Sequence, residues 1–269
     1  MEQKFLHAHH AIDLDAPDTN LTSDYEWFTE AAELYKEKMA AYRNGSLVLP
    51  PVTKSLAPNK YPIPIIVNGC GASGKDTFVD FLEQYLMRNN IAIARYSTVD
   101  MVYDAVYTLL SSDSRDSVDR SIECKDNDFR MLMSSIKDLW SDYCDGPFNY
   151  VMTTYNDIVD TNRKNPPMSD EDIHTRFVTY MVREPDEIRR TIHFFRRHGI
   201  PAITLMICGL TDPSDYTNHA DRDVMKNIQY DVTYENLEGQ MDQLEKHTHE
   251  FGDLINMIYL NNAYNLMIR

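Results

Sequence analysis

The residues of this sequence that are best suited to chemistry form one segment, Gly69–Thr77, which reads GCGASGKDT. Gly69, Gly74 and Lys75 fit the pattern G-x-x-x-x-G-K, in which glycines let the backbone curl and point successive N–H groups at phosphate oxygens. The lysine adds a compact positive charge, and the helix that begins there adds the positive end of its dipole. The spacing therefore predicts a site for the phosphates of a nucleoside triphosphate.

The surroundings of this segment support the prediction. An apolar stretch typical of a strand, residues 63–68, leads into it, and a stretch with helical apolar spacing, residues 75–88, leads out. A strand before the glycines and a helix after them is the arrangement that the motif requires. The residues expected to hold the triphosphate are Gly69, Gly71, Ala72, Ser73, Gly74, Lys75, Asp76 and Thr77.

One position departs from the general pattern. A Ser or Thr that binds magnesium usually follows the lysine, but here Asp76 follows it and Thr77 comes one place later. Adjacent helical residues point about 100° apart, so Thr77 cannot simply replace that hydroxyl. Asp76 is a hard oxygen donor that can hold magnesium directly or through water. We expect Mg²⁺ because a transferring phosphoryl group needs its charge neutralised, with Asp76 and Thr77 as its protein ligands.

Apolar runs alternate with helical stretches from Ile63 onward, which predicts an α/β domain with a five-stranded, mostly parallel sheet covered on both faces. The expected strands are residues 63–68, 91–96, 176–181, 202–208 and 229–234. The expected helices are residues 75–88, 100–111, 128–144, 147–160, 185–198 and 237–258, with a polar loop at 161–174. We predict a P-loop domain over residues 59–269, preceded by an N-terminal extension over residues 1–58 with one helix at 24–43.

Bulk composition narrows the function classes. The net charge is -16, which disfavours tight binding to a nucleic-acid polymer and favours small-molecule substrates. The sequence contains no run of about 18 apolar residues, so we expect no membrane span. We also find no apolar segment typical of a signal peptide in the first residues, MEQKFLHAHHAIDLDAPD, and therefore expect a cytoplasmic protein. The cysteines follow no zinc or thioredoxin spacing. Cys124, Cys144 and Cys208 are interpreted as small packing residues, and Cys70 as part of the loop.

GKDT after a strand resembles the deoxynucleoside monophosphate kinases of bacteriophages and related bacterial P-loop kinases. Further segments that are similar to this group follow in the same order: STVDMVYDAV (97–106), DLWSDYCDGPFNYV (138–151), VREPDEI (182–188), NHADRDV (218–224) and YDVTYENLEG (230–239). The likeness covers roughly residues 60–260. It implies the nucleoside monophosphate kinase version of the P-loop NTPase fold, with an acceptor-binding insert and a mobile lid. It also implies an ATP- and Mg²⁺-dependent transferase acting on (deoxy)nucleoside monophosphates.

The resemblance assigns roles to matching positions. Lys75, Arg183 and Arg222 would be catalytic, with Arg183 gripping the acceptor phosphate and Arg222 reaching transition-state charge from the lid. Ser97 and Asp100 would meet the acceptor. The alternatives are that Ser97 and Asp100 cap a helix, and that Arg183 pairs with Glu184 or Asp186 on the surface. Lys226, Asn218 and His219 are weaker candidates for the lid.

Two departures leave other functions open. The group usually places a magnesium-organising Asp where this sequence has Met181, so Asp76, Glu184 or Asp186 would have to replace it. Residues 209–217 in the lid region contain no basic side chain. The alternatives are a kinase with another acceptor, either a small phosphorylated metabolite or a modified pyrimidine in DNA, and a nucleotide-binding protein without turnover.

The sequence allows three roles for the helix at 24–43: it seals the sheet, mediates a homodimer or covers the acceptor site. The arginines of the helix at 185–198 are expected to be mostly solvated, with Arg190 paired to Asp186 four residues earlier.

Overall fold

A computed structural model describes five stretches of the chain, residues 61–109, 127–164, 174–209, 228–236 and 240–268. All of them belong to the second of two units into which the chain divides, Pro50–Arg269. The helix predicted at 24–43 and the domain boundary predicted after residue 58 lie outside the described residues. None of the described helices is both long enough and apolar enough to cross a membrane.

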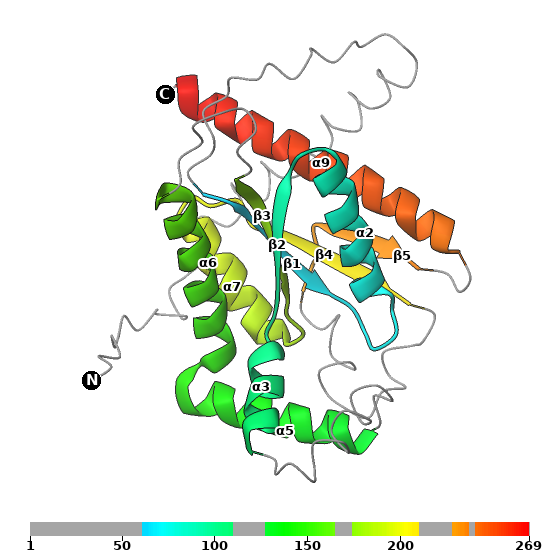
Figure 1. Ribbon diagram of the computed structural model, residues 1–269, viewed down its shortest axis with the longest axis vertical. Coiled ribbons are helices and arrows are strands. Elements are labelled where there is room, and N and C mark those ends of the chain that lie inside the picture. The colour runs from blue at the N-terminus through cyan, green and yellow to red at the C-terminus, as the bar shows by residue number, and fades with distance from the viewer. Residues whose placement is uncertain (1–60, 110–126, 165–173, 210–227, 237–239, 269) are drawn as a thin grey trace. The chain divides into compact units, whose positions relative to one another are not determined.

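A five-stranded parallel sheet forms the centre of this unit (Figure 1). The order across the sheet is β2-β3-β1-β4-β5, so β1 is the central strand. Parallel neighbours need crossover connections, which place the carboxyl ends of all five strands at one edge. The strands are β1 (Ile63–Asn68), β2 (Ala92–Ser97), β3 (Thr175–Met181), β4 (Ile203–Cys208) and β5 (Val232–Glu235).

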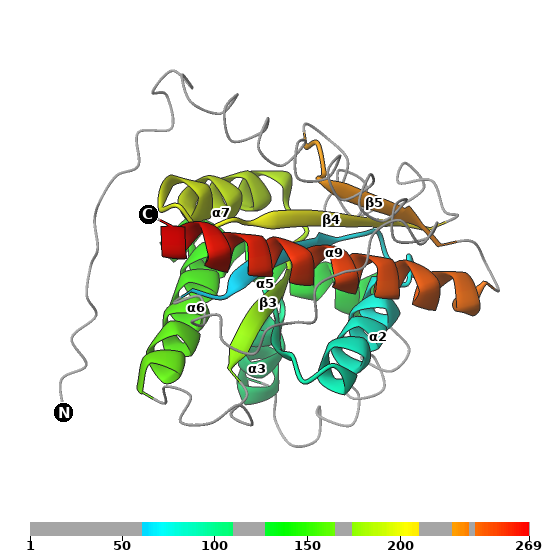
Figure 2. The same ribbon diagram turned by 90° about the horizontal axis from the view of Figure 1, so that it is seen from above.

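The described helices cover both faces of the sheet, as Figures 1 and 2 show. Val178 and Tyr180 of β3 are buried in a core with α6 and α7. The neighbouring Phe177 points the other way, and its ring centroid lies 5.7 Å from that of Tyr259 on α9. The predicted three-layer α/β arrangement is therefore confirmed. The helices are α2 (Lys75–Arg88), α3 (Asp100–Leu109), α5 (Asn127–Cys144), α6 (Gly146–Lys164), α7 (Pro185–Arg197) and α9 (Met241–Ile268).

The strands and helices predicted from Ile63 onward are present in the part of the chain that the structure describes, with shifts at their ends. The bounds of β1 and α2 are as predicted. The polar loop predicted at 161–174 is partly wrong, because α6 continues to Lys164 with Arg163 and Lys164 in its last turn, where cations favour the helix dipole. The strand predicted at 229–234 is instead Val232–Glu235. Its first residues are outside the strand because the Asp231 backbone N–H is bound by the Thr204 side chain.

Cysteine packing differs from position to position. Cys70 is buried against Met206, and the partly buried Cys208 packs beside them. The expectation for Cys144 is wrong, because this residue is exposed at the end of α5. Its thiol lies 3.6 Å from the carbonyl oxygen of Trp140. Cys124 lies outside the described residues.

The arginines of α7 are paired more extensively than the sequence predicts. Arg190 binds Asp145 at 2.8 Å, and Asp186 pairs with Arg189 instead, so the predicted Arg190–Asp186 pair is wrong. Three residues separate Arg189 from Asp186, a spacing that also places two side chains on one helix face.

Arg196 is not solvated either. Its guanidinium lies 3.1 Å from the Asp231 carboxylate, whose side chain is 2% exposed. Asp231 also accepts hydrogen bonds from the backbone N–H and the hydroxyl of Thr204, at 2.7 and 2.8 Å. These contacts tie α7, β4 and the start of β5 together with one buried carboxylate.

Replacing Asp231 by alanine is expected to destabilise the fold strongly. The change leaves Arg196 and the Thr204 N–H without their buried acceptor, and breaking a buried pair costs about 3 kcal/mol. Urea unfolding of the full chain measures the difference. The matched control is Asp160→Ala, which removes an exposed pair with Arg163 and should change the free energy of unfolding by less than about 1 kcal/mol. Equal effects of the two variants on the free energy of unfolding would contradict the stabilising role given to the Asp231 carboxylate.

Candidate functional site

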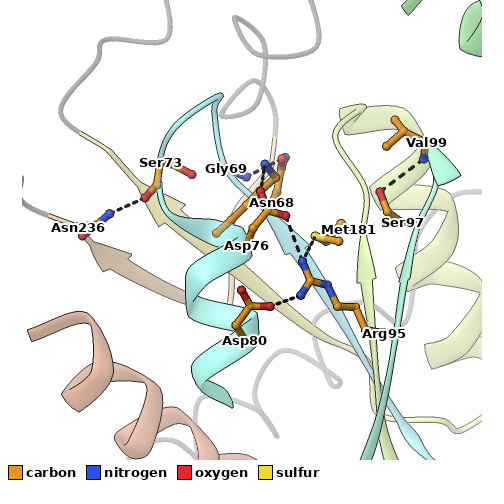
Figure 3. A network of polar contacts seen from close by, with 11 residues as sticks. Asn68, Gly69, Ser73, Asp76, Asp80, Arg95, Ser97, Val99, Met181 and Asn236 are labelled. Carbon is orange, nitrogen blue, oxygen red and sulfur yellow. Dashed lines mark hydrogen bonds and ion pairs between the residues drawn. The ribbon is translucent and has the colours of Figure 1, made fainter. Parts of the chain in front are cut away.

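The segment Gly69–Thr77 joins the central strand β1 to α2, and its turn is held by side chains of neighbouring elements (Figure 3). The Gly69 backbone N–H donates to Asn68 Oδ1 at 2.7 Å. The Asn68 amide donates in turn to the hydroxyl of Tyr230 at 2.7 Å. At the other side, the Asn236 amide donates to the Ser73 carbonyl at 2.9 Å. The loop is thus anchored from residues near β5, which the sequence motif does not reveal.

Two glycines of this loop are required by their surroundings. A Cβ at Gly69 would lie 2.8 Å from the carbonyl oxygen of Ile207, which is too close for any side chain. Gly74 has φ of 85°, and a Cβ there would overlap the Asn236 amide. Ala72 also has positive φ, 59°. The backbone therefore packs closely against β4 and β5 on one side and lines a cavity with Gly71, Ala72 and Gly74 on the other.

This cavity has a volume of about 690 Å³ and brings most of the predicted site residues together. It extends from the loop past the carboxyl ends of β2 and β3 to α3 and α5. Ligands bind at this edge in open parallel sheets. The predicted residues that line it are Gly71, Ala72, Gly74, Lys75, Asp76, Thr77, Ser97, Asp100 and Arg183.

Three predicted residues are not in the lining. Gly69 and Ser73 are buried beneath the loop, where Ser73 Oγ has no hydrogen-bond partner among the described residues. Gly69 and Ser73 would therefore contribute only backbone groups to an anion site. Arg222 lies outside the described residues, together with Asn218, His219 and Lys226, so the lid remains a prediction.

Lys75 is buried at the start of α2, with a side chain that is 8% exposed. Its Nζ lies 3.4 Å from Asp76 Oδ2 and lines the cavity. The Phe78 N–H donates to the Gly74 carbonyl at 2.9 Å, which begins the helix directly behind the lysine. A buried ammonium at a helix N-terminus is a strong attraction for an anion entering the cavity.

Arg95 is a cavity residue that the sequence analysis missed. It comes from β2, and its guanidinium lies 3.3 Å from Asp76 Oδ1, in contact with Asp80 and 4.0 Å from the sulfur of Met181 (Figure 3). The signal that could have found it is one charged residue in the otherwise apolar run IAIARY. With Lys75, Lys137 and Arg183 it is one of four cationic residues that line the cavity.

The thioether sulfur of Met181 therefore lies beside the Arg95 guanidinium, at the position where the resembled kinases have a magnesium-organising Asp. Of the three carboxylates expected to replace a magnesium-organising Asp, Glu184 is bound to Lys137 at 3.2 Å. Asp186 is 82% exposed and pairs with Arg189. Asp186 does not line the cavity, whereas Glu184 and Asp76 do, and Asp76 is likewise paired, with Lys75 and Arg95. Asp76 is the carboxylate within the Gly69–Thr77 segment itself.

The donor set fits a magnesium ion that is bound mainly by phosphate and water. Among the described residues, no group of three or more His, Cys, Asp and Glu side chains is arranged to hold a metal. Mg²⁺ typically keeps several waters and uses one or two protein oxygens with substrate phosphates. Asp76 and Thr77 both line the cavity and would be the protein oxygens for such an ion.

Asp100 is the first residue of α3 and lines the cavity, and its side chain contacts the turn before the helix. Its carboxylate accepts a hydrogen bond from the Ser97 backbone N–H at 2.9 Å. The Ser97 hydroxyl lies 3.5 Å from the Val99 backbone N–H, at the limit for a hydrogen bond. Burial raises the pKa of Asp100, against the lowering by this hydrogen bond and by the charge of Arg95.

The wall of the cavity away from the loop combines aromatic rings with a buried ion-pair group. The rings of Tyr103 on α3 and Phe129 on α5 are stacked with centroids 5.9 Å apart. Lys137, only 5% exposed, lies 3.2 Å from Glu184 Oε1 and 3.4 Å from Glu187 Oε2. Burial raises the pKa of Glu187, an effect that the Lys137 charge only partly offsets.

Arg183 follows β3 and also reaches the cavity. Its carbonyl oxygen lies 3.4 Å from the Asn68 amide nitrogen, which connects the turn after β3 to the beginning of the loop. The carboxylates predicted as alternative partners of Arg183 also have other cationic partners, Lys137 for Glu184 and Arg189 for Asp186. Glu184 lines the same cavity as Arg183, so a pair between these two residues stays an alternative to the acceptor-phosphate role.

Comparisons with known proteins add little to this description. No protein-family model and no curated protein matches the sequence. Among solved structures, the chain is similar to the APS kinase CysC of Mycobacterium tuberculosis, determined as a cysteine-to-alanine mutant. That likeness has 9% sequence identity and a TM-score of 0.39, and it covers 73% of this chain and 98% of that one.

Replacing Arg95 by alanine is expected to weaken ATP binding in the absence of Mg²⁺ by about tenfold. The change removes a positive charge from the cavity lining, together with its ion pairs to Asp76 and Asp80, and a charge-assisted contact is worth about 1.4 kcal/mol or more. Titration calorimetry at low salt measures the dissociation constant. Arg88→Ala, at the exposed end of α2, should leave the dissociation constant unchanged. Unchanged or tighter binding by the Arg95 variant would contradict the role.

The raised pKa of Glu187 predicts a pH-dependent stability. A carboxyl that holds its proton more firmly in the folded state than in the unfolded state contributes less stability as the pH rises above its ordinary value of 4.5. Glu187→Gln is therefore expected to flatten the decrease in the free energy of unfolding between acidic and neutral pH. Urea unfolding across that range checks this, with the half-exposed Glu245→Gln as the control. An identical pH slope for wild type and the Glu187 variant would refute it.

Proposed function

We propose that this protein is an ATP- and Mg²⁺-dependent phosphotransferase, and specifically a (deoxy)nucleoside monophosphate kinase. The observation that carries the proposal is one cavity that joins the phosphate loop with Lys75 to Arg183 after β3. Lys75 lies at the loop and Arg183 follows the neighbouring strand β3, and two cations placed in this way suit a reaction between two phosphate groups. The acidic net charge supports mononucleotide substrates over a nucleic-acid polymer.

In the proposed reaction, an oxygen of the acceptor phosphate attacks the γ-phosphorus of ATP, the bond from that phosphorus to the bridging oxygen breaks, and ADP leaves. Bound Mg²⁺ would supply neutralisation of the phosphate charge, held through Asp76 and Thr77. Lys75 and the N-terminus of α2 hold the β- and γ-phosphates. Arg183 orients the acceptor phosphate through its planar guanidinium.

No covalent intermediate on the protein is needed, because positioning and charge stabilisation account for most catalysis of this kind. The loop is suited to positioning, since the Asn68 and Asn236 side chains fix both of its sides. Two reacting groups held in one partly enclosed cavity meet at a high effective concentration. A lid that carries Arg222 would complete the site by excluding water.

The test is a coupled assay of ADP release with ATP and Mg²⁺ over the ribo- and deoxyribonucleoside monophosphates. At least one monophosphate should stimulate ADP release well above the rate with ATP alone. Lys75→Ala should lower that rate by at least about 100-fold, since it removes a charge that acts on the transferring group. Lys246→Ala, which removes a side chain that is 73% exposed, is the matched control and should retain full activity.

No stimulation by any monophosphate would refute the acceptor class. Full activity of the Lys75 variant would refute the loop as the triphosphate site. ADP release stimulated only by other phosphorylated metabolites would keep the phosphotransferase and replace its acceptor.

A further inference from the structure

Arg95 contacts two carboxylates of α2 with different nitrogen atoms. Its Nη2 lies 3.3 Å from Asp76 Oδ1, and its Nη1 contacts Asp80 Oδ1 (Figure 3). Asp76 and Asp80 are four residues apart, so both carboxylates lie on one face of the helix. The guanidinium therefore bridges one helical turn, and loss of either contact leaves it bound to the other carboxylate.

The two carboxylates differ in their position relative to the cavity. Asp76 lines the cavity together with Arg95, whereas Asp80 lies outside the lining. The side chain of Asp80 is 53% exposed, and that of Arg95 is 27% exposed. Asp80 thus gives the guanidinium a partner that does not depend on the cavity.

The acidic face of α2 continues beyond Asp80 with Glu83, three residues further along the helix. Burial raises the pKa of Glu83, the charge of Arg95 lowers it, and the charge of Asp80 raises it. The guanidinium therefore acts on this part of α2 as well as on Asp76. If Arg95 leaves Asp76, its charge remains beside carboxylates.

Asp76 is held by two cations at once. Lys75 Nζ lies 3.4 Å from its Oδ2, and Arg95 Nη2 lies 3.3 Å from its Oδ1. The neighbouring Met181 offers Arg95 a thioether sulfur at 4.0 Å, which is a weak acceptor and a poor ligand for magnesium. Of these two neighbours of Arg95, Asp76 is the one that suits both a guanidinium and a magnesium ion.

We propose that Arg95 holds the Asp76 carboxylate while no metal is bound, and releases it to remain on Asp80 when Mg²⁺ binds with the triphosphate. This inference rests on the proposed function, because it concerns the triphosphate site of that reaction. A guanidinium and a divalent cation on one carboxylate repel each other at short range, so one opposes the other. Lys75 turns to the phosphates in the same exchange. All four side chains keep oppositely charged partners before and after it.

This exchange gives Arg95 opposite effects with and without Mg²⁺. Without the metal, the guanidinium lies at the cavity and attracts the phosphates. With the metal, it competes for Asp76 and opposes metal binding. The ratio of the ATP dissociation constant without Mg²⁺ to that with Mg²⁺ is therefore lower when Arg95 is present. A residue that only supported the fold would leave this ratio unchanged.

Titration calorimetry of the full chain with ATP, in Mg²⁺ and in EDTA, measures the ratio. Arg95→Met should raise it by about tenfold or more, because a charge-assisted contact is lost without the metal and a competitor is lost with it. Asp80→Asn should lower the ratio, because Asp76 then holds the guanidinium more firmly. Arg88→Met, at the exposed end of α2, is the control and should leave the ratio unchanged.

An Asp76→Asn background isolates the competition. In that background Arg95→Met should weaken ATP binding equally with and without Mg²⁺, so the ratio should stay the same. Binding of ATP in Mg²⁺ at least as tight as that of the wild type also verifies that the single Arg95 variant is folded.

A ratio that Arg95→Met leaves unchanged or lowers would overturn the inference. Asp80→Asn changes a half-exposed side chain, so it tests the inference even if the Arg95 variant does not fold. An unchanged or raised ratio in the Asp80 variant would overturn the inference as well.

The ADP-release assay separates this inference from the proposed function. The predicted ratios without turnover of any monophosphate would leave the inference in place and refute the kinase. Turnover of a monophosphate with equal ratios in the wild type and the Arg95 variant would do the reverse. Absence of ATP binding by the wild-type chain would refute both.

Discussion

The close packing of the phosphate loop's backbone against the carboxyl ends of β4 and β5 is the constraint on which the site depends. A Cβ at Gly69 would meet the Ile207 carbonyl, and a Cβ at Gly209 would lie 3.0 Å from the Cα of Ser73. The Asn236 amide then fixes the Ser73 carbonyl. Because one side of the loop has no room for side chains, its other side is presented to the cavity as bare backbone. That is the surface a triphosphate needs.

The strand order places a second part of the site, the turn after β3, next to the loop. With β1 central and β3 beside it, the turn after β3 is adjacent to the loop, and the Asn68 side chain contacts the backbone of that turn. Arg183 and Glu184 follow at once, so the cation proposed for the acceptor phosphate and a carboxylate that lines the cavity come from consecutive residues. Lys137 then links this turn to α5. One short stretch of backbone thereby connects the loop, the turn after β3 and α5.

The sheet and the phosphate loop could be predicted from the sequence because their signals are local. Strand β1 and helix α2 have the predicted bounds, since an apolar run, glycines and an amphipathic helix follow each other directly. Contacts between segments that are far apart in the chain could not be predicted, because no local sequence pattern indicates them. The Arg95–Asp76 pair depends on how β2 lies beside α2, and the Lys137–Glu184 pair joins residues 47 positions apart by sequence number. A lone charge in an apolar strand or on a helix face does not identify its partner.

The central claim is that the backbone of Gly69–Thr77 binds a triphosphate, and glycine-labelled NMR tests it most directly. The chain has nine glycines, so a ¹⁵N-glycine spectrum resolves the loop with few signals. Adding ATP with Mg²⁺ should shift the amide signals of Gly71 and Gly74 strongly, while Gly199, which has open space around it, should not move. If the loop signals stay in place at saturating ATP, or move no more than that of Gly199, the account of this site is wrong.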